Sequence, residues 1–336
     1  MELDMNVMQS IFGQYDSYLS KIEKQFQVVI INRDGKVRVK GEQDAVRKAE
    51  KLIASLAASV QNGSALEEQR VDYALSLSGE EEEAAFDEMD RMCICHTVTG
   101  KPIRPKTMGQ KAYVEAMKKH MIVFGLGPAG TGKTYLAMAM AITAFKNNEV
   151  ERIILTRPAI EAGEKLGFLP GDLQSKVDPY LRPLYDALYQ IMGAESFQKN
   201  MEKGLIEVAP LAYMRGRTLD NAYIILDEAQ NTTEAQMKMF LTRIGFGSRV
   251  VITGDSSQKD LAYGTKSGLD IALRVLSKVE EIAFCQLTSR DVVRHPLVQK
   301  IVKAYEEYEK KETRKASAGK KREKDTRARS GRVSDR

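Results

Sequence analysis

The sequence has few cysteines and no apolar run long enough to cross a membrane. Three cysteines in 336 residues are too few for a disulfide framework, and they predict a reducing compartment. Runs such as Met121–Leu126 are far too short to span a bilayer, and the first ten residues lack the basic and apolar segments of a secretory signal. We therefore expect a cytoplasmic protein with no membrane partner.

Excess charge is scarce outside the C-terminus. Residues 309–336 hold twelve Lys and Arg against five Asp and Glu, whereas the rest of the chain sums to about −2. Because this segment has almost no large apolar side chain, we predict a basic, disordered tail. Such a tail can recruit nucleic acid by counterion release, or it can be a solvated terminus with no dedicated partner.

The composition of the whole sequence, 43% hydrophobic and 29% charged, is typical of a globular protein. Residues 106–308 alternate strand and helix patterns, which predicts an α/β fold with a mostly parallel sheet covered by helices on both faces. The expected strands are Met121–Leu126, Arg152–Thr156, Ile206–Pro210, Tyr223–Leu226, Arg249–Thr253 and Ile282–Leu287.

Two shorter regions precede this domain. Residues 1–62 read as a small α/β domain, with strands at Phe26–Asn32 and Lys36–Gly41, a hairpin turn at Asp34-Gly35, and an amphipathic helix after them. Residues 63–105 contain the acidic run Glu80–Glu83 and no lasting periodicity, so we predict an acidic linker region.

A phosphate-binding loop is the strongest motif. Residues 127–134 fit the pattern G-x-x-x-x-G-K-[ST] between an expected strand and an expected helix. Its glycines allow backbone N–H groups to face an anion, and the helix N-terminus adds partial positive charge. The loop predicts binding of ATP or a close relative through Gly127, Pro128, Ala129, Gly130, Thr131, Gly132, Lys133 and Thr134. Lys133 should reach the β- and γ-phosphates, and the Thr134 hydroxyl should ligate Mg²⁺.

Two further strands end in polar groups. The run Tyr223–Leu226 is followed by Asp227, which we expect to hold Mg²⁺, and by Glu228, which we expect to polarise the attacking water as general base. After Arg249–Thr253, Gln258 is a candidate γ-phosphate sensor and Asp255 a residue that orients the phosphate or a water. Ligands bind at the carboxyl ends of strands in such sheets.

Ahead of the loop, Gln110 lies in Pro105–Gln110, and its amide offers the donor and acceptor that match the polar edges of adenine.

Six motifs together resemble the PhoH-like protein family, which is similar to the first motor domain of superfamily 1 helicases. They are KTMGQ, GPAGTGKT, LTRPAIEAGEKLGFLPGDL, YIILDEAQNTT, ITGDSSQ and DVVRHPLV.

The resemblance covers about residues 105–308. It implies a RecA-like P-loop NTPase with a three-layer αβα sandwich, an ATPase that uses ATP and Mg²⁺, and a cytoplasmic hexamer. It also implies RNA metabolism with helicase-like activity, or ribosomal RNA processing with an endoribonuclease partner. On the family pattern Gln110 reads adenine, Asp227 and Glu228 serve the metal and the base, Gln258 senses the γ-phosphate, and Arg294 is a late catalytic arginine, with Arg290 as its competitor.

Helicases of this superfamily clamp ATP between two motor domains, whereas this sequence has room for one. We therefore expect the catalytic arginine to come from a neighbouring subunit of a homo-oligomeric ring.

Residues 11–56 are similar to a KH domain, whose loop would be Gly13–Asp16 with an acid in place of the second glycine. This domain could bind RNA, or it could serve protein interaction or oligomerisation. The segment Thr156–Leu173, with Arg157 and Lys165, and the pair Arg215/Arg217 are further candidate RNA contacts.

Three functions stay open at this point. The first is an RNA-stimulated ATPase that moves along or remodels RNA. The second is a nucleotide-driven switch or assembly scaffold for a protein partner, without translocation. The third is a small-molecule kinase, which the adjacent Asp227 and Glu228 disfavour because they suit water as the nucleophile.

Overall fold

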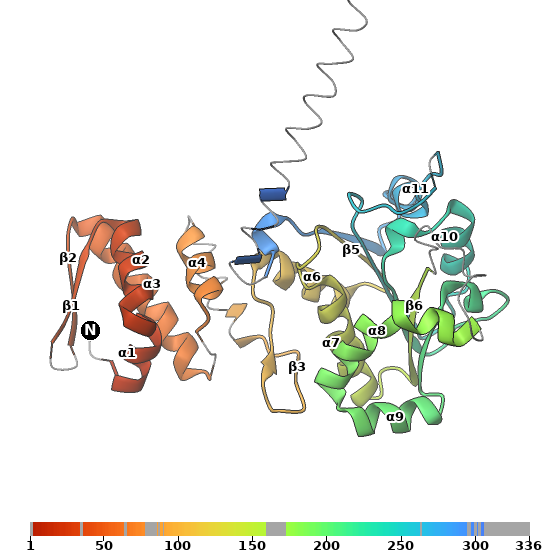
Figure 1. Cartoon of the computed structure of the whole chain (residues 1–336), viewed down its shortest axis with the longest axis horizontal. Coiled ribbons are helices and arrows are strands. Elements are labelled where there is room, and N and C mark those ends of the chain that lie inside the picture. The colour runs from red at the N-terminus through yellow and green to blue at the C-terminus, as the bar shows by residue number, and fades with distance from the viewer. Residues whose placement is uncertain are drawn as a thin grey trace, which may run out of the picture. The chain divides into compact units, whose positions relative to one another are not determined.

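The structure is a computed structural model. It describes residues 3–33, 36–63, 66–77, 86, 88–89, 91–158, 173–262, 264–293, 297–298, 301 and 304–305, with the backbone alone for 173–180 (Figure 1). Contacts divide the chain into Met1–Val293 and Arg294–Arg336. Most of the second unit, including the predicted disordered tail, lies outside the described residues. No helix among the described residues is long and apolar enough to cross a membrane.

The N-terminal part is a small α/β unit, as the sequence predicts. Its elements are α1 (Met5–Phe12), η1 (Gln14–Asp16), α2 (Ser17–Phe26), β1 (Val29–Arg33), β2 (Lys36–Lys40) and α3 (Gln43–Gln61). The two strands pair antiparallel, with Ile30 opposite Val39. The expected first strand begins too early, because α2 continues to Phe26 and Gln27 ends it with a left-handed φ of 56°. The hairpin turn at Asp34-Gly35 lies outside the described residues.

The region 63–105 contains more structure than a linker pattern suggests. It includes α4 (Glu68–Ser76) and a short antiparallel pair, β3 (Cys95–His96) and β4 (Pro102–Ile103). Phe86 packs into the N-terminal core, whereas Ile94 and Ile103 pack into the core of the larger sheet. The acidic run Glu80–Glu83 lies outside the described residues, and the domain boundaries stay predictions.

The larger part is built on a six-stranded sheet in which every neighbouring pair is parallel. The strand order is β10-β5-β9-β8-β6-β7. The strands are β5 (Ile122–Leu126), β6 (Arg152–Arg157), β7 (Ile206–Pro210), β8 (Ala222–Leu226), β9 (Arg249–Gly254) and β10 (Ile282–Gln286). Each differs from its predicted bounds by at most one residue at either end, because continuous apolar runs suit strands buried on both faces.

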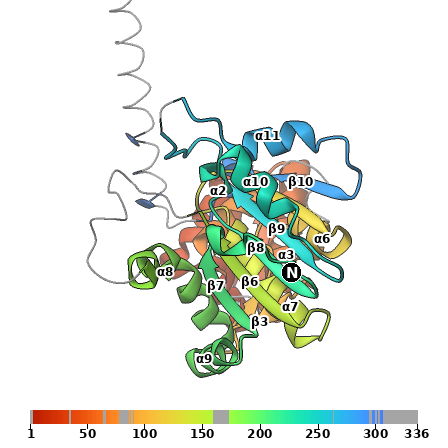
Figure 2. The same ribbon diagram turned by 90° about the vertical axis from the view of Figure 1, so that its right-hand side faces the viewer.

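Helices cover both faces of this sheet and make three layers (Figure 2). On β9, Val251 faces a core formed with α6 (Met108–Lys119), α7 (Lys133–Lys146), α8 (Leu173–Met192) and α9 (Ala194–Glu202). Val250 and Ile252 face the opposite core, formed with η3 (Leu211–Met214), α10 (Glu234–Leu241) and α11 (Gly268–Val275). This alternation confirms the three-layer αβα prediction. The parallel pairing of the strands brings their C-terminal ends to one edge of the sheet.

Candidate nucleotide site

The glycine loop joins the end of β5 to the start of α7. Gly127, Gly130 and Gly132 have φ values of 143°, 85° and 77°, which side chains with a Cβ rarely adopt. In the described part of the chain, no side chain caps the N-terminus of α7. The N–H groups of its first turn are therefore available to an anion, as the loop motif requires.

Lys133 is folded back onto the loop. Its Nζ donates to the carbonyl oxygen of Gly127 at 2.6 Å and to that of Pro128 at 2.9 Å, and the residue is only 9% exposed. The Tyr113 hydroxyl donates to the Lys133 carbonyl at 3.4 Å, and burial raises the pKa of Tyr113 well above its usual value, so this ring stays neutral. The loop thus holds an ammonium group that could exchange carbonyl partners for phosphate oxygens.

The expected metal residues meet at the edge of the sheet. Thr134 Oγ1 donates to Asp227 Oδ1 at 2.7 Å, and Thr253 Oγ1 donates to the same oxygen at 2.7 Å. Mg²⁺ in phosphate sites is usually held by one or two carboxylates, waters and substrate phosphates. The described residues contain no group of three or more His, Cys, Asp or Glu that would make an all-protein cage. The oxygens of Thr134 and Asp227 therefore fit the way Mg²⁺ binds with a nucleotide.

Glu228 follows Asp227 with a left-handed backbone, φ 54°. Arg157 at the end of β6 pairs with its Oε1 at 3.2 Å, and Gln230 Nε2 donates to its Oε2. The carboxylate is about one-third exposed, so water can reach it. The structure therefore brings the expected base next to the expected metal residues, and it places Arg157, expected as an RNA contact, against that base.

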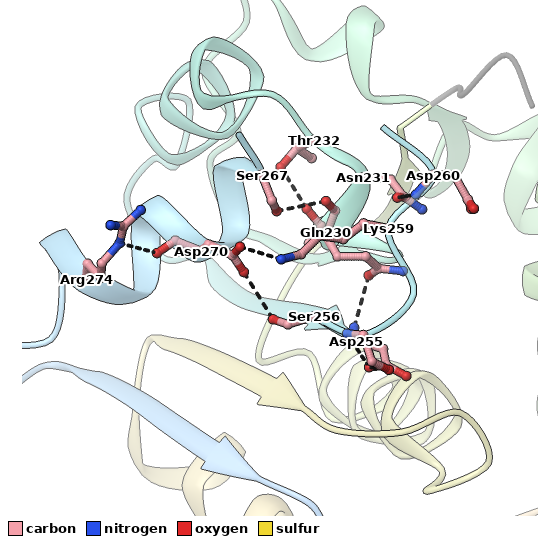
Figure 3. Close-up of polar contacts among 12 residues, drawn as sticks. Gln230, Asn231, Thr232, Asp255, Ser256, Lys259, Asp260, Ser267, Asp270 and Arg274 are labelled. Carbon is pink, nitrogen blue, oxygen red and sulfur yellow. Dashed lines mark hydrogen bonds and ion pairs between the residues drawn. The ribbon is translucent and has the colours of Figure 1, made fainter. Parts of the chain in front are cut away.

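The segment after β9 is fastened to its surroundings (Figure 3). The Asp255 backbone N–H donates to Gln230 Oε1 at 3.0 Å, and the Asp260 N–H donates to Asn231 Oδ1 at 2.8 Å. Lys259 pairs with Asp270 of α11 at 2.5 Å. Asp255 Oδ2 is buried with no hydrogen-bond partner among the described residues, which fits the expectation that this carboxylate orients a water or a phosphate.

Gln258 lies within this segment, but its side chain makes no hydrogen bond to the described residues. It is exposed, and its backbone N–H donates to the Asp255 carbonyl at 3.0 Å. Its role as a γ-phosphate sensor stays a prediction.

Gln110 links the segment before α6 to the phosphate loop. The residue is 3% exposed; its Oε1 accepts from the Lys106 N–H at 2.7 Å, and its Nε2 donates to the Thr131 carbonyl at 3.0 Å. Both polar groups of the amide thus have partners without a nucleotide. Its role as an adenine contact stays a prediction.

The segment 287–293 lies against the same loop. The Val293 N–H donates to the Gly130 carbonyl at 2.9 Å, and buried Asp291 Oδ1 accepts from Thr107 Oγ1 at 2.6 Å. Arg290 in this segment is exposed, and Arg294 lies outside the described residues. The choice between the two arginines stays a prediction.

Gly127 offers a direct test of the loop. A Cβ on Gly127 would meet the Leu287 carbonyl oxygen at 2.4 Å, in a backbone region that costs other residues about 1–3 kcal/mol. Gly127→Ala should lower the free energy of unfolding in urea by at least that amount and weaken nucleotide binding. Gly204→Ala is the matched control, because Gly204 has φ 69° but open space at its Cβ. Equal nucleotide affinity in both variants would contradict the expectation that this loop binds the phosphates.

A parallel sheet with a glycine loop after one strand and paired carboxylates after another defines the class of P-loop nucleotide-binding proteins. The chain belongs to the PhoH-like protein family, because the family's model matches residues 102–306. It is 55% identical over 297 residues to a PhoH-like protein of Bacillus subtilis (strain 168), covering 88% of this chain and 93% of that protein.

Two other relatives differ in how much of the chain they match. A PhoH-like protein of Mycobacterium tuberculosis (strain ATCC 25618 / H37Rv) is 51% identical over 312 residues, 92% of this chain and 88% of that protein. Protein PhoH of Escherichia coli (strain K12) is 46% identical over 206 residues, 61% of this chain and 58% of that protein. A solved Sulfolobus solfataricus SWI2/SNF2 ATPase core in complex with dsDNA matches 44% of this chain and 31% of that one at 17% identity and a TM-score of 0.30, too distant to carry an argument.

Sequence reasoning gave no role to three residues that shape this site. Gln230, which is fully buried, bridges Glu228 and the Asp255 backbone. Thr253 bonds Asp227, and Asp291 ties the Gln110 segment to the chain after β10. The available signal was position: Gln230 and Thr253 follow or end strands that carry the predicted carboxylates.

Proposed function

We propose that this protein is a Mg²⁺-dependent ATPase whose turnover is stimulated by RNA. The observation that carries the ATPase is the pair of adjacent carboxylates beyond β8. Asp227 accepts a hydrogen bond from the Thr134 hydroxyl in the first turn of α7. Its neighbour Glu228 instead pairs with Arg157 and accepts from Gln230. In this proposal Asp227 helps to bind the metal, and Glu228 acts as the general base that accepts a proton from water.

The residues divide the chemistry among themselves. Lys133 and the N–H groups of α7 bind phosphate oxygens, and Thr134 with Asp227 holds the metal shell. When bound, Mg²⁺ neutralises charge on the phosphates. Glu228 orients a water and accepts its proton. Gln230 hydrogen-bonds both Glu228 and the Asp255 backbone, and so fixes their positions relative to each other.

Three features support RNA as the stimulus. Arg157, which pairs with Glu228, belongs to the segment Thr156–Leu173 that the sequence predicts to contact RNA. Residues 11–56 are similar to a KH domain, and residues 309–336 carry a net charge of +7. A ligand that recruits Arg157 would change the surroundings of the base carboxylate, which would couple RNA binding to ATP turnover.

Phosphate release from Mg²⁺-ATP, measured without nucleic acid, with single-stranded RNA and with single-stranded DNA, tests the proposal. We expect turnover in all three cases and the highest rate with RNA. Identical rates in the three cases would contradict stimulation by RNA but would still support ATP hydrolysis. No phosphate release under any condition would contradict both.

A nucleotide-driven switch or scaffold for a protein partner, such as an endoribonuclease, is the second candidate. It is favoured by the two donors on Glu228, because a base carboxylate that is already bonded predicts slow turnover. Stimulation by a protein partner, with no response to RNA, would select this candidate over the first.

The proposed ATPase works as a ring in which a neighbouring subunit supplies an arginine to the γ-phosphate. The described residues form one parallel sheet with one glycine loop, which supports the proposal that the arginine comes from a neighbouring copy of this chain. Light scattering with and without nucleotide should give a mass of several subunits, and a monomer in both states would contradict the ring.

A further inference from the structure

A basic groove lies outside the nucleotide site. It has a volume of about 530 Å³ and runs between the chain after η3 and the helix α10. Its lining includes Arg215, Gly216, Lys238, Met239, Thr242 and Arg243. None of these residues belongs to the glycine loop or to the carboxylate pair, so the groove is a separate feature of the surface.

The groove concentrates positive charge. Arg215, Lys238 and Arg243 line it, no carboxylate does, and among the described residues none of the three cations has an acidic partner within ion-pair distance. Arg243 Nε is buried with no hydrogen-bond partner in the described part of the chain. Three cations around one hollow raise the local potential and favour an anionic ligand.

A neighbouring arginine shows how the fold neutralises such a charge elsewhere. Arg217 donates to both carboxylate oxygens of Glu207, at 2.6 and 2.7 Å. The sequence suggested Arg215 and Arg217 as equal candidates for RNA contact, and the structure separates them. Arg217 already has a bidentate partner, so Arg215 is the arginine left for a ligand.

Helix electrostatics explain only part of the groove. Lys238 lies in the last turn of α10 and Arg243 follows that helix closely, where the helix dipole favours cations. Arg215 comes from a different segment, just after η3, so its charge is not part of the capping of α10 within that helix. Its convergence with the other two therefore points to a shared ligand.

We propose that this groove binds the sugar-phosphate backbone of single-stranded RNA. A row of phosphates matches several cations in one channel, and contacts to phosphates carry no sequence information. Tyr213 precedes Arg215 by two residues and is 46% exposed; it does not line the groove, but an exposed aromatic ring on the same segment can stack on a base of an RNA strand.

The groove also has a route to the ATPase. Helix α10 starts a few residues after Glu228, through η4 (Ala229–Asn231), which carries Gln230. RNA held by Lys238 in α10 and by Arg243 just after it would act on a helix that η4 connects to Glu228, the expected base. The choice of RNA as the ligand rests on the proposed function, whereas the anionic character of the ligand rests on the groove alone.

Binding of a labelled, unstructured RNA of about 16 nucleotides to the full chain, measured by fluorescence anisotropy at several salt concentrations, tests the inference. Arg215→Gln/Lys238→Gln removes two exposed cations of the groove. We expect a loss of affinity that is uniform across RNA sequences, with the salt dependence reduced by about one unit of slope for each residue. Adding Arg243→Gln should weaken binding further.

The matched control is Lys118→Gln/Lys119→Gln, which removes the same charge from exposed lysines at the end of α6. It should bind RNA as the wild type does. Equal losses in the two double variants, or displacement of RNA by polyglutamate as readily as by unlabelled RNA, would overturn the inference. An unchanged thermal shift with Mg²⁺-ATP verifies that the groove variants fold.

The outcomes separate the inference from the proposed function. If the wild-type chain binds RNA and the groove variant binds it equally well, the groove assignment fails and the RNA-dependent ATPase stands. If the wild-type chain binds no RNA at any salt concentration, the RNA dependence fails and the groove assignment fails with it.

Discussion

Glu228→Gln should retain Mg²⁺-ATP binding and lower the ATPase rate by about two to four orders of magnitude. The amide has nearly the same shape as the carboxylate, but it cannot take a proton from water. In the structure Glu228 has donors on both oxygens, from Arg157 and Gln230, and it lies next to Asp227, the residue expected to hold the metal. Steady-state phosphate release and nucleotide titration of the same preparation separate the two effects.

Glu234→Gln is the control for this variant. Glu234 is exposed in the first turn of α10, and the same chemical change there should leave the rate unchanged. A Glu228→Gln variant that turns over ATP at the wild-type rate would show that another group is the base. Asp255, whose buried Oδ2 has no partner among the described residues, would then be the next candidate.

Lys133→Ala should weaken Mg²⁺-ATP binding by about 10- to 100-fold, since a hydrogen bond to a charged group contributes about 1.5–3 kcal/mol. Lys133 is 9% exposed and its ammonium donates to the carbonyls of Gly127 and Pro128, so it already lies within the loop expected to receive the phosphates. The rise in melting temperature that Mg²⁺-ATP produces should nearly vanish in the variant.

Lys146→Ala at the other end of α7 is the matched control, because it removes the same charge from an exposed position on the same helix. Its melting temperature should rise with Mg²⁺-ATP as the wild type's does. Equal shifts in both lysine variants would mean that the glycine loop is not where the phosphates bind.

The strands of the large sheet could be predicted from sequence because their burial leaves a plain signal. Runs such as Ile122–Leu126 and Ala222–Leu226 are apolar on both faces, and only a strand covered on both sides requires that pattern. The strand order carries no such signal. β9 lies between β5 and β8 although it follows both in the chain, and that placement depends on how the connecting helices pack.

The same contrast holds in the site. Lys133, Thr134 and Asp227 could be placed from motif and strand ends, because the geometry of a strand, loop and helix is local. The bond from Arg157 to Glu228 depends on β6 and β8 being neighbours, which the sequence does not state. The folding of α4 and of the β3–β4 pair within the expected linker was also missed, since short elements carry little periodicity.

Calorimetric titration of the folded chain with a slowly hydrolysed ATP analogue and Mg²⁺ tests the central claim most directly. We predict saturable binding with one nucleotide per chain, and a large loss of affinity when Mg²⁺ is removed. Absence of any heat of binding to correctly folded protein, or binding that is indifferent to Mg²⁺, would contradict the account of the site.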